Sequence, residues 1–199
     1  MTVFRRHRDE IVGSLSEAEA ELLRHAAEQM LLLLGAAAPA AGEVPAPAPS
    51  ADPLDELTGL GTLPSGPPSD PALERLFPDG YRDDAPAAAE LRRFTEDDLR
   101  AGKVERLRGL YTAVPAGGGE VRLDDAGADA WLRALTDLRL VLGVRLEVEA
   151  DTDPYQLAHE ALESGDEAMA TSALLYHYAG ALSQTLVDAL MGDGPFGEV

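Results

Sequence analysis

The chain has 199 residues, and its hydrophobic content of 45% is enough for one buried core but hardly for two full domains. It contains no cysteine, which excludes a disulfide, a thiolate metal site and a thiol redox switch of its own. The formal net charge of -20 disfavours binding to nucleic-acid phosphates unless the basic residues gather on one surface.

Neither a membrane span nor a secretion signal is visible in the sequence. The longest apolar run, residues 30–34, is far shorter than the roughly 18 to 20 residues that a spanning helix needs. Residues 1–8 carry arginines, but no apolar segment with a small-residue cleavage site follows them. We therefore predict a cytoplasmic protein without membrane contact.

The N-terminal segment, residues 1–34, is predicted to form a hairpin and a helix that packs on the core. Residues 3–6 and 10–12 flank Arg8-Asp9, a pattern that allows a small hairpin. Ser16 stands three residues before Glu19, which predicts a capping box and a helix that ends near Gly35. The predicted core-facing residues of this helix are Ala18, Leu22, Ala26, Met30 and Leu33.

Residues 35–69 differ in composition from the segments on either side. They contain eight of the fourteen prolines, together with many alanine, glycine and serine residues, and this predicts a flexible linker. Leu54, Leu57 and Leu60 recur within it at a spacing of three. They belong either to a short turn that docks on the core or a partner, or to a solvated linker with scattered leucines.

Residues 70–192 are predicted to form the main helical domain, followed by a tail at residues 193–199. Asp70-Pro71 predicts a short helix, and residues 86–94 predict a second helix. Thr95 and Asp98 form a candidate capping pair for a third, separate helix. After a loop and a short strand at residues 120–123, we expect helices capped by Asp124, Asp153 and Asp166, the last of them ending at Gly192.

The helix after Asp124 is the predicted centre of the core. Its apolar stripe consists of Trp131, Leu135, Leu138 and Leu142. Asp137 and Arg139 interrupt this helix, so we expect at least one of them to form a buried or partly buried ion pair. With six or seven helices and no regular alternation of strands and helices, the predicted fold is mainly α, an irregular multi-helix domain with minor β structure.

No motif in the chain predicts catalysis, a metal or a cofactor. His159 and Glu163 lie one helical turn apart, but a firm third ligand is missing, so we read them as helix surface. His177 lies between two tyrosines and is predicted to be structural. The glycines at residues 117–119 lack the lysine and hydroxyl residue of a phosphate-binding loop and are read as a flexible connection. The chain is therefore predicted not to be an enzyme.

The clearest local excess of basic over acidic residues lies between Arg92 and Arg108. The residues predicted to bind DNA or a partner protein are Arg92, Arg93, Arg100, Lys103 and Arg106. Arg100, Lys103 and Arg106 are expected to be exposed if they bind phosphates or an acidic surface. The alternative is internal neutralisation, because Glu96 and Arg100 have the spacing of a favourable helical ion pair.

Three blocks of the sequence carry a family resemblance. They are residues 70–84 (DPALERLFPDGYRDD), residues 91–100 (LRRFTEDDLR) and residues 131–146 (WLRALTDLRLVLGVRL). Together they resemble the actinobacterial AosR-like family of oxidative-stress transcriptional regulators, otherwise catalogued as a domain of unknown function. The resemblance covers residues 1–34 and 70–190 and leaves the predicted linker uncovered.

The resemblance implies a cytoplasmic protein that controls transcription of sulfur and cysteine metabolism under oxidative stress, acting with a sigma factor. A redox-responsive cysteine pair is associated with the family's regulator, and this chain has no cysteine. Direct thiol sensing therefore does not carry over. The first hypothesis is a transcription-associated regulator that contacts promoter DNA or the transcription machinery. The alternative is a noncatalytic protein adaptor that does not bind nucleic acid.

Overall fold

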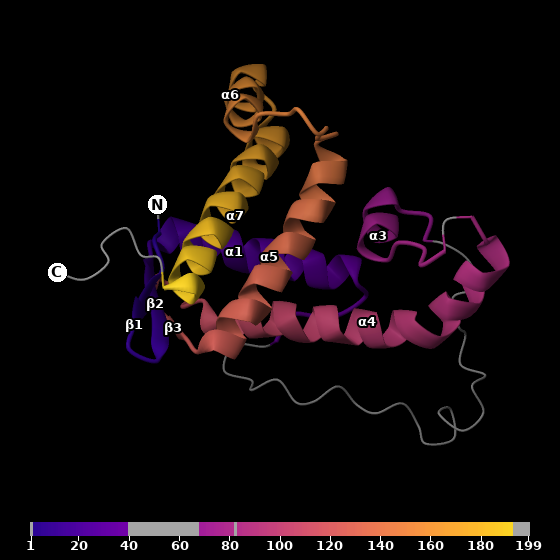
Figure 1. The fold of residues 1–199 in the computed structure, drawn as a ribbon. Helices are drawn as coiled ribbons and strands as arrows, with labels where there is room; N and C mark the ends of the chain where they lie inside the picture. Colours follow the sequence, from indigo (N-terminus) through magenta and orange to yellow (C-terminus); the bar gives the residue numbers. More distant parts are fainter. Residues whose placement is uncertain (1, 40–67, 82, 193–199) are drawn as a thin grey trace.

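The computed structural model describes residues 2–39, 68–81 and 83–192, and the described chain is mainly helical (Figure 1). Within these residues six helices accompany one three-stranded sheet, in agreement with the predicted fold class. The predicted tail and most of the predicted linker, including Leu54, Leu57 and Leu60, lie outside the described residues. No described helix is long and apolar enough to cross a membrane.

The sheet joins the N-terminus to the middle of the chain. Strands β1 (Arg5–His7) and β2 (Glu10–Leu15) form the predicted hairpin, and β3 (Gly119–Leu123) pairs antiparallel with β2. Gly13 faces the core, where a Cβ atom would lie 2.7 Å from the ring of Phe4. Phe4 in turn meets the ring of Trp131 edge to face, with 5.7 Å between centroids. The sheet is thereby fixed to the helical core.

Helix α1 (Glu17–Leu33) begins with the predicted capping box. The Glu19 carboxylate accepts hydrogen bonds from the backbone N–H groups of Ser16 and Thr2, both at 2.9 Å. Desolvation would raise the pKa of Glu19, but these hydrogen bonds outweigh it and lower the pKa to about 2. The prediction of the buried face was partly wrong: Ala26 and Met30 are buried, whereas Ala18 is exposed and Ala20 and Leu23 take its place.

Helices α3 (Pro71–Leu76) and α4 (Ala85–Ala113) follow. The prediction of a break before Thr95 was wrong, because α4 is continuous through this position. The Asp84 side chain caps α4 by accepting a hydrogen bond from the Ala87 N–H at 3.0 Å. The Thr95 hydroxyl donates to the Leu91 carbonyl at 2.9 Å, so it bonds back within the helix and does not start a new one.

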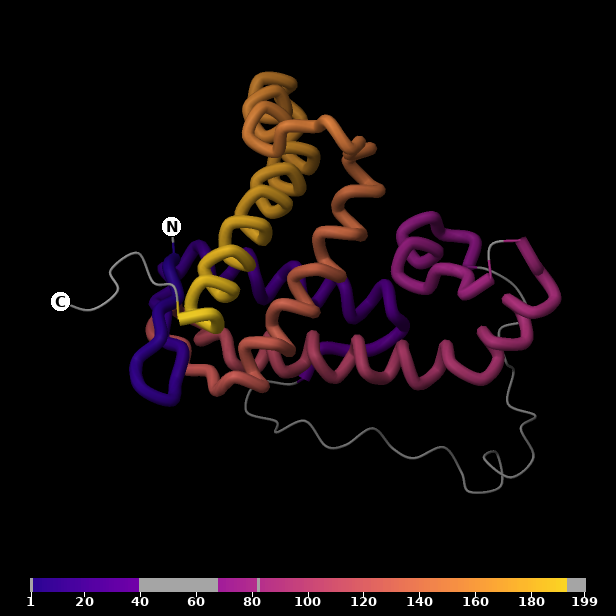
Figure 2. The backbone as a smooth tube through the Cα atoms, in the orientation of Figure 1, coloured from indigo at the N-terminus to yellow at the C-terminus, as the bar shows by residue number. Residues whose placement is uncertain are grey.

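The last three helices are α5 (Asp125–Arg145), α6 (Pro154–Ser164) and α7 (Glu167–Met191), each with its predicted aspartate cap. The tube drawing shows that α5 and α7 run side by side in opposite directions, while α1 and α4 run across them (Figure 2). All four residues of the predicted α5 stripe are buried, which confirms that prediction: Trp131, Leu135, Leu138 and Leu142.

Candidate functional site

All five candidate binding residues lie on α4, and Arg92 is the most deeply buried of them. Its guanidinium donates to the carboxylates of Asp79 and Glu96 and to the Phe77 carbonyl. Burial alone would lower the pKa of Arg92, but hydrogen bonds to the two carboxylates raise it above its ordinary value. Arg92 therefore joins the loop after α3 to α4 and does not face solvent.

Arg100 lies two turns further along the same face of α4. Its guanidinium is 2.8 Å from the other oxygen of Glu96, so one carboxylate joins Arg92 and Arg100. It also donates to the Leu34 carbonyl at 3.4 Å and stacks over the Phe77 ring, 4.6 Å from the centroid. Arg100 thus connects the end of α1 to α4 and α3.

Lys103 continues this row and reaches α5. Its ammonium donates to Asp137 at 2.6 Å, with side chains only 13% and 9% exposed. This pair confirms the prediction that Asp137 or Arg139 would form a buried or partly buried ion pair. Both charges are largely removed from water, so the pair stabilises the packing of α4 on α5 only while both partners are present.

The remaining two candidates differ from each other. Arg106 is half-buried, its Nε has no hydrogen-bond partner among the described residues, and its charge helps Arg133 to lower the pKa of Asp129. Arg93 is exposed and forms no ion pair with any residue that the structure describes. The expectation that Arg100, Lys103 and Arg106 are exposed was therefore wrong, because they lie against α1, α3 and α5.

The sequence predicted only some of the ion pairs that α4 forms. The spacing of Glu96 and Arg100 predicted their ion pair, which was the stated alternative to a binding surface. Asp79 was missed, because its contact with Arg92 depends on how the loop after α3 folds back on α4. The partner of Asp137 was likewise not readable from spacing, since Lys103 lies 34 residues away on another helix.

The weaker chemical candidates lie outside α4. His159 and Glu163 lie 3.6 Å apart and are both exposed, and no cluster of three possible metal ligands occurs among the described residues. His177 meets the ring of Tyr155 edge to face at 6.3 Å. Gly118 has a φ of 78°, and a Cβ there would lie 2.7 Å from the backbone nitrogen of Glu17. Glycine at this position therefore allows two backbone segments to approach each other closely.

One known family matches almost the whole chain. The family model described as Domain of unknown function (DUF2017) matches residues 1–190. The chain belongs to this family. A protein of Mycobacterium tuberculosis named oxidative stress regulator AosR is 35% identical over 193 residues, which cover 90% of this chain and 82% of the relative.

Two further relatives extend the comparison. The Mycobacterium bovis protein of the same name has the same identity and coverage. A Mycobacterium leprae protein named putative oxidative stress regulator AosR is 34% identical over 158 residues, covering 71% of this chain and 70% of the relative. These relatives carry the names of regulators and not of enzymes. No solved structure matches the chain.

Proposed function

We propose that this chain is a noncatalytic oxidative-stress regulator that acts on transcription by binding a protein, with no direct contact to DNA. The relatives named oxidative stress regulators support the regulatory role. A sigma factor or another component of the transcription machinery is the proposed partner, and the cytoplasm is the proposed location. Control of sulfur and cysteine metabolism is the proposed output, on the strength of the family resemblance alone.

The ion pairs of α4 are the observation that favours protein over DNA. A chain of net charge -20 needs its few basic residues on one surface to hold phosphates. Arg92, Arg100 and Lys103 are instead hydrogen-bonded to carboxylates inside the fold. Phosphate contacts by these three side chains would require breaking largely buried ion pairs, which is costly.

The test compares DNA and protein binding by the same preparation. Fluorescence anisotropy with promoter DNA at low salt should give no binding beyond that of a DNA of unrelated sequence. Purified RNA polymerase and sigma factors of the source bacterium, immobilised separately, should retain the chain. Binding to DNA alone that weakens in the Arg93→Gln variant would refute the proposal, because Arg93 is the exposed candidate cation. Retention by none of the transcription proteins would also refute it.

A further inference from the structure

Helix α1 crosses α5 and α7 (Figure 1), and side chains of these three helices line an apolar groove. Its volume is about 790 Å³, within the range of ligand-binding clefts. The apolar lining residues are Leu22, Ala26, Met30, Leu32 and Leu33 from α1, Leu138, Val141 and Leu142 from α5, and Ala168 and Leu175 from α7. Leu32 is 59% exposed, so apolar surface also continues out of the groove.

The polar residues on the α7 wall offer little to a polar ligand. The Thr171 hydroxyl donates to the Glu167 carbonyl and the Ser172 hydroxyl to the Ala168 carbonyl, each at 2.8 Å. Their donors are thus used within α7, which leaves these two hydroxyl oxygens able only to accept hydrogen bonds. His25 and Gln29 add polar groups from α1, but ten of the sixteen lining residues are apolar. An occupant of this groove must therefore be recognised chiefly by apolar contact.

The dimensions of the groove suit a helix. Leu22 and Leu33 are eleven residues apart on α1, which corresponds to about 16 Å at 1.5 Å per residue. This is about three helical turns, enough for a partner helix to place apolar residues at i, i+3 or i+4, and i+7. The groove is therefore long enough for the helix-in-groove mode of recognition.

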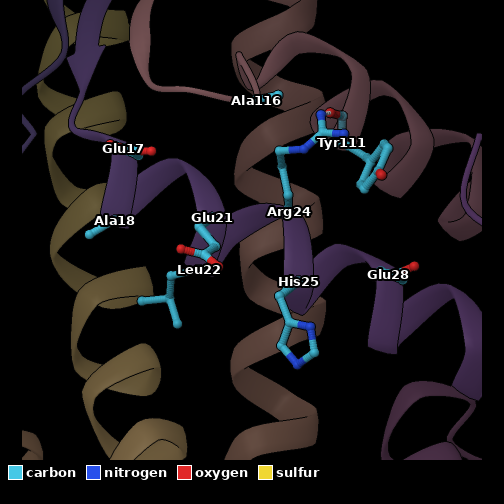
Figure 3. A pocket seen from close by; sticks show the side chains of 9 residues that line it. All are labelled: Glu17, Ala18, Glu21, Leu22, Arg24, His25, Glu28, Tyr111 and Ala116. Atoms are coloured by element: carbon cyan, nitrogen blue, oxygen red, sulfur yellow. Dashed lines mark hydrogen bonds between the residues drawn. The ribbon is translucent and has the colours of Figure 1, made fainter. Parts of the chain in front are cut away.

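The charges beside the groove are mainly acidic. Next to its α1 side, Glu17, Glu21 and Glu28 are exposed and surround a shallow pocket (Figure 3). The Arg24 side chain in this pocket points away from the groove, donates to the carbonyls of Tyr111 and Val114 at 2.8 and 3.0 Å, and stacks on the Tyr111 ring. It is thereby held against the end of α4.

The cation at the far end of the groove has an acidic partner. Arg145 lines this end, and its guanidinium donates to Asp70 at 2.6 Å. Glu167, which also lines the groove, is exposed. A second copy of the chain carries the same net charge of -20, and the repulsion between the two copies disfavours self-association. Charge complementarity selects a basic partner.

We propose that the α1–α5–α7 groove binds an amphipathic helix of a partner protein, with the apolar face of that helix in the groove and basic residues beside Glu17, Glu21 and Glu28. This inference rests on the proposed function and names the chemistry of its protein partner. Apolar burial provides most of the affinity, and the acidic residues of α1 select basic helices and speed their association.

The probe is a fluorescein-labelled 20-residue amphipathic peptide with leucines at helical spacing and lysine or arginine elsewhere. Two peptides serve as controls: one of the same composition in scrambled order, and one in which glutamate replaces every basic residue. Fluorescence anisotropy with the full chain should show that the basic amphipathic peptide binds at least tenfold more tightly than either control. Equal binding of the scrambled peptide would overturn the proposal, since it would indicate charge attraction alone.

A matched pair of variants locates the binding. Thr171 and Thr136 are both exposed helix residues whose hydroxyls donate to the carbonyl four residues earlier, but only Thr171 lines the groove. Thr171→Arg should weaken peptide binding at least tenfold, because it adds bulk and positive charge to the groove. Thr136→Arg should leave it unchanged. Equal effects of both substitutions would overturn the proposal.

A second pair of variants tests the charge contribution. The double variant Glu21→Gln/Glu28→Gln should flatten the salt dependence of peptide binding. The control is Glu74→Gln/Glu105→Gln, which changes the net charge by the same amount at exposed residues of other helices. The control should leave the salt dependence unchanged. A salt dependence that is equal in the two double variants would contradict the basic partner.

Other occupants give distinct results. Sedimentation that shows a dimer dissociated by Thr171→Arg would assign the groove to a second copy and overturn the proposal. Competition by a synthetic peptide of residues 40–67 would assign it to the chain itself, with the same consequence. If a transcription protein retains the Thr171→Arg variant as well as the wild type, the groove is not the binding site, but the proposed function stands. Peptide binding at the groove without retention by any transcription protein refutes the function alone.

Discussion

Lys103 and Asp137 form an ion pair of 2.6 Å between α4 and α5, with both side chains largely buried. The pair lies at one end of a row in which Arg92, Glu96 and Arg100 are also joined. Removing two charges from water is costly, and their attraction offsets that cost only while both partners are present. Arg92, Arg100 and Lys103 of α4 therefore contribute to the stability of the fold.

Removing one partner of this pair should destabilise the fold more than removing both. Lys103→Met leaves a largely buried carboxylate without its cation and should lower the free energy of unfolding by about 3 kcal/mol. Lys103→Met/Asp137→Leu should recover most of this loss, because no buried charge remains. Urea unfolding of the wild type, the two single variants and the double variant measures the coupling. Additive losses in the double variant would show that the two side chains do not interact.

Arg92 and Arg93 are adjacent in sequence but differ in environment, which makes them a matched test. Arg92→Gln should destabilise the fold by about 3 kcal/mol, because it leaves Glu96 buried without its partner on that side. Arg93→Gln should change the free energy of unfolding by less than about 0.5 kcal/mol, since Arg93 is exposed. Chemical denaturation followed by circular dichroism gives both values. Similar losses in the two variants would contradict the structural role of Arg92.

Local chemistry made much of this fold predictable from sequence. A side chain that caps a helix bonds to a backbone N–H two or three residues away, so its signal lies within one turn. Ser16, Asp70, Asp124, Asp153 and Asp166 were all placed correctly at helix starts for this reason. The same rule failed at Thr95, because a threonine hydroxyl can also bond to the carbonyl four residues earlier inside a helix.

The candidate site was less predictable than the fold, because side-chain exposure depends on tertiary contacts. A run of basic residues on a helix looks the same in sequence whether it faces solvent or neighbouring helices. The decisive partners of Arg92 and Lys103 are Asp79 and Asp137, which lie 13 and 34 residues away. The groove between α1, α5 and α7 is equally invisible in sequence, since it exists only after the three helices pack.

Truncation at the centre of α5 should be costly. Leu138 is buried and also lines the groove, so Leu138→Ala removes apolar contacts with the core and leaves a cavity. We expect a loss of roughly 2 to 5 kcal/mol in the free energy of unfolding. Leu162→Ala serves as the control, because Leu162 is exposed on α6 and should cost less than about 1 kcal/mol. Equal losses would mean that Leu138 is not part of the core.

Hydrogen peroxide should act on this protein only through methionine, because no thiol is present. Met191 and Met169 are 73% and 46% exposed, whereas Met30 is 3% exposed in the core. Peptide mass spectrometry should detect sulfoxide first at Met191 and Met169 and much later at Met30. Dithiothreitol should not reverse the change. Early oxidation of Met30 would indicate that α1 separates readily from the core.

The Glu19 carboxylate should make stability depend on pH in the acidic range. Its pKa is about 2 in the folded chain against an ordinary value of 4.5, since the N–H groups of Ser16 and Thr2 and the Ser16 hydroxyl donate to the charged form. A lowered pKa means that the stabilisation is complete above about pH 4.5 and is lost as the pH falls towards 2. At pH 7 we expect Glu19→Gln to cost about 2 kcal/mol, a figure reduced from the full shift because Glu19 is only half-buried.

The difference between the wild type and Glu19→Gln isolates this contribution from the many other carboxylates of the chain. Urea unfolding at pH 7, 5, 4 and 3 should show a constant difference at pH 7 and 5 that shrinks at pH 4 and further at pH 3. Glu21→Gln on the same helix is the control, because Glu21 is exposed and its substitution should show no comparable trend. A wild-type advantage that stays constant down to pH 3 would mean that the hydrogen bonds of Glu19 do not favour its charged form.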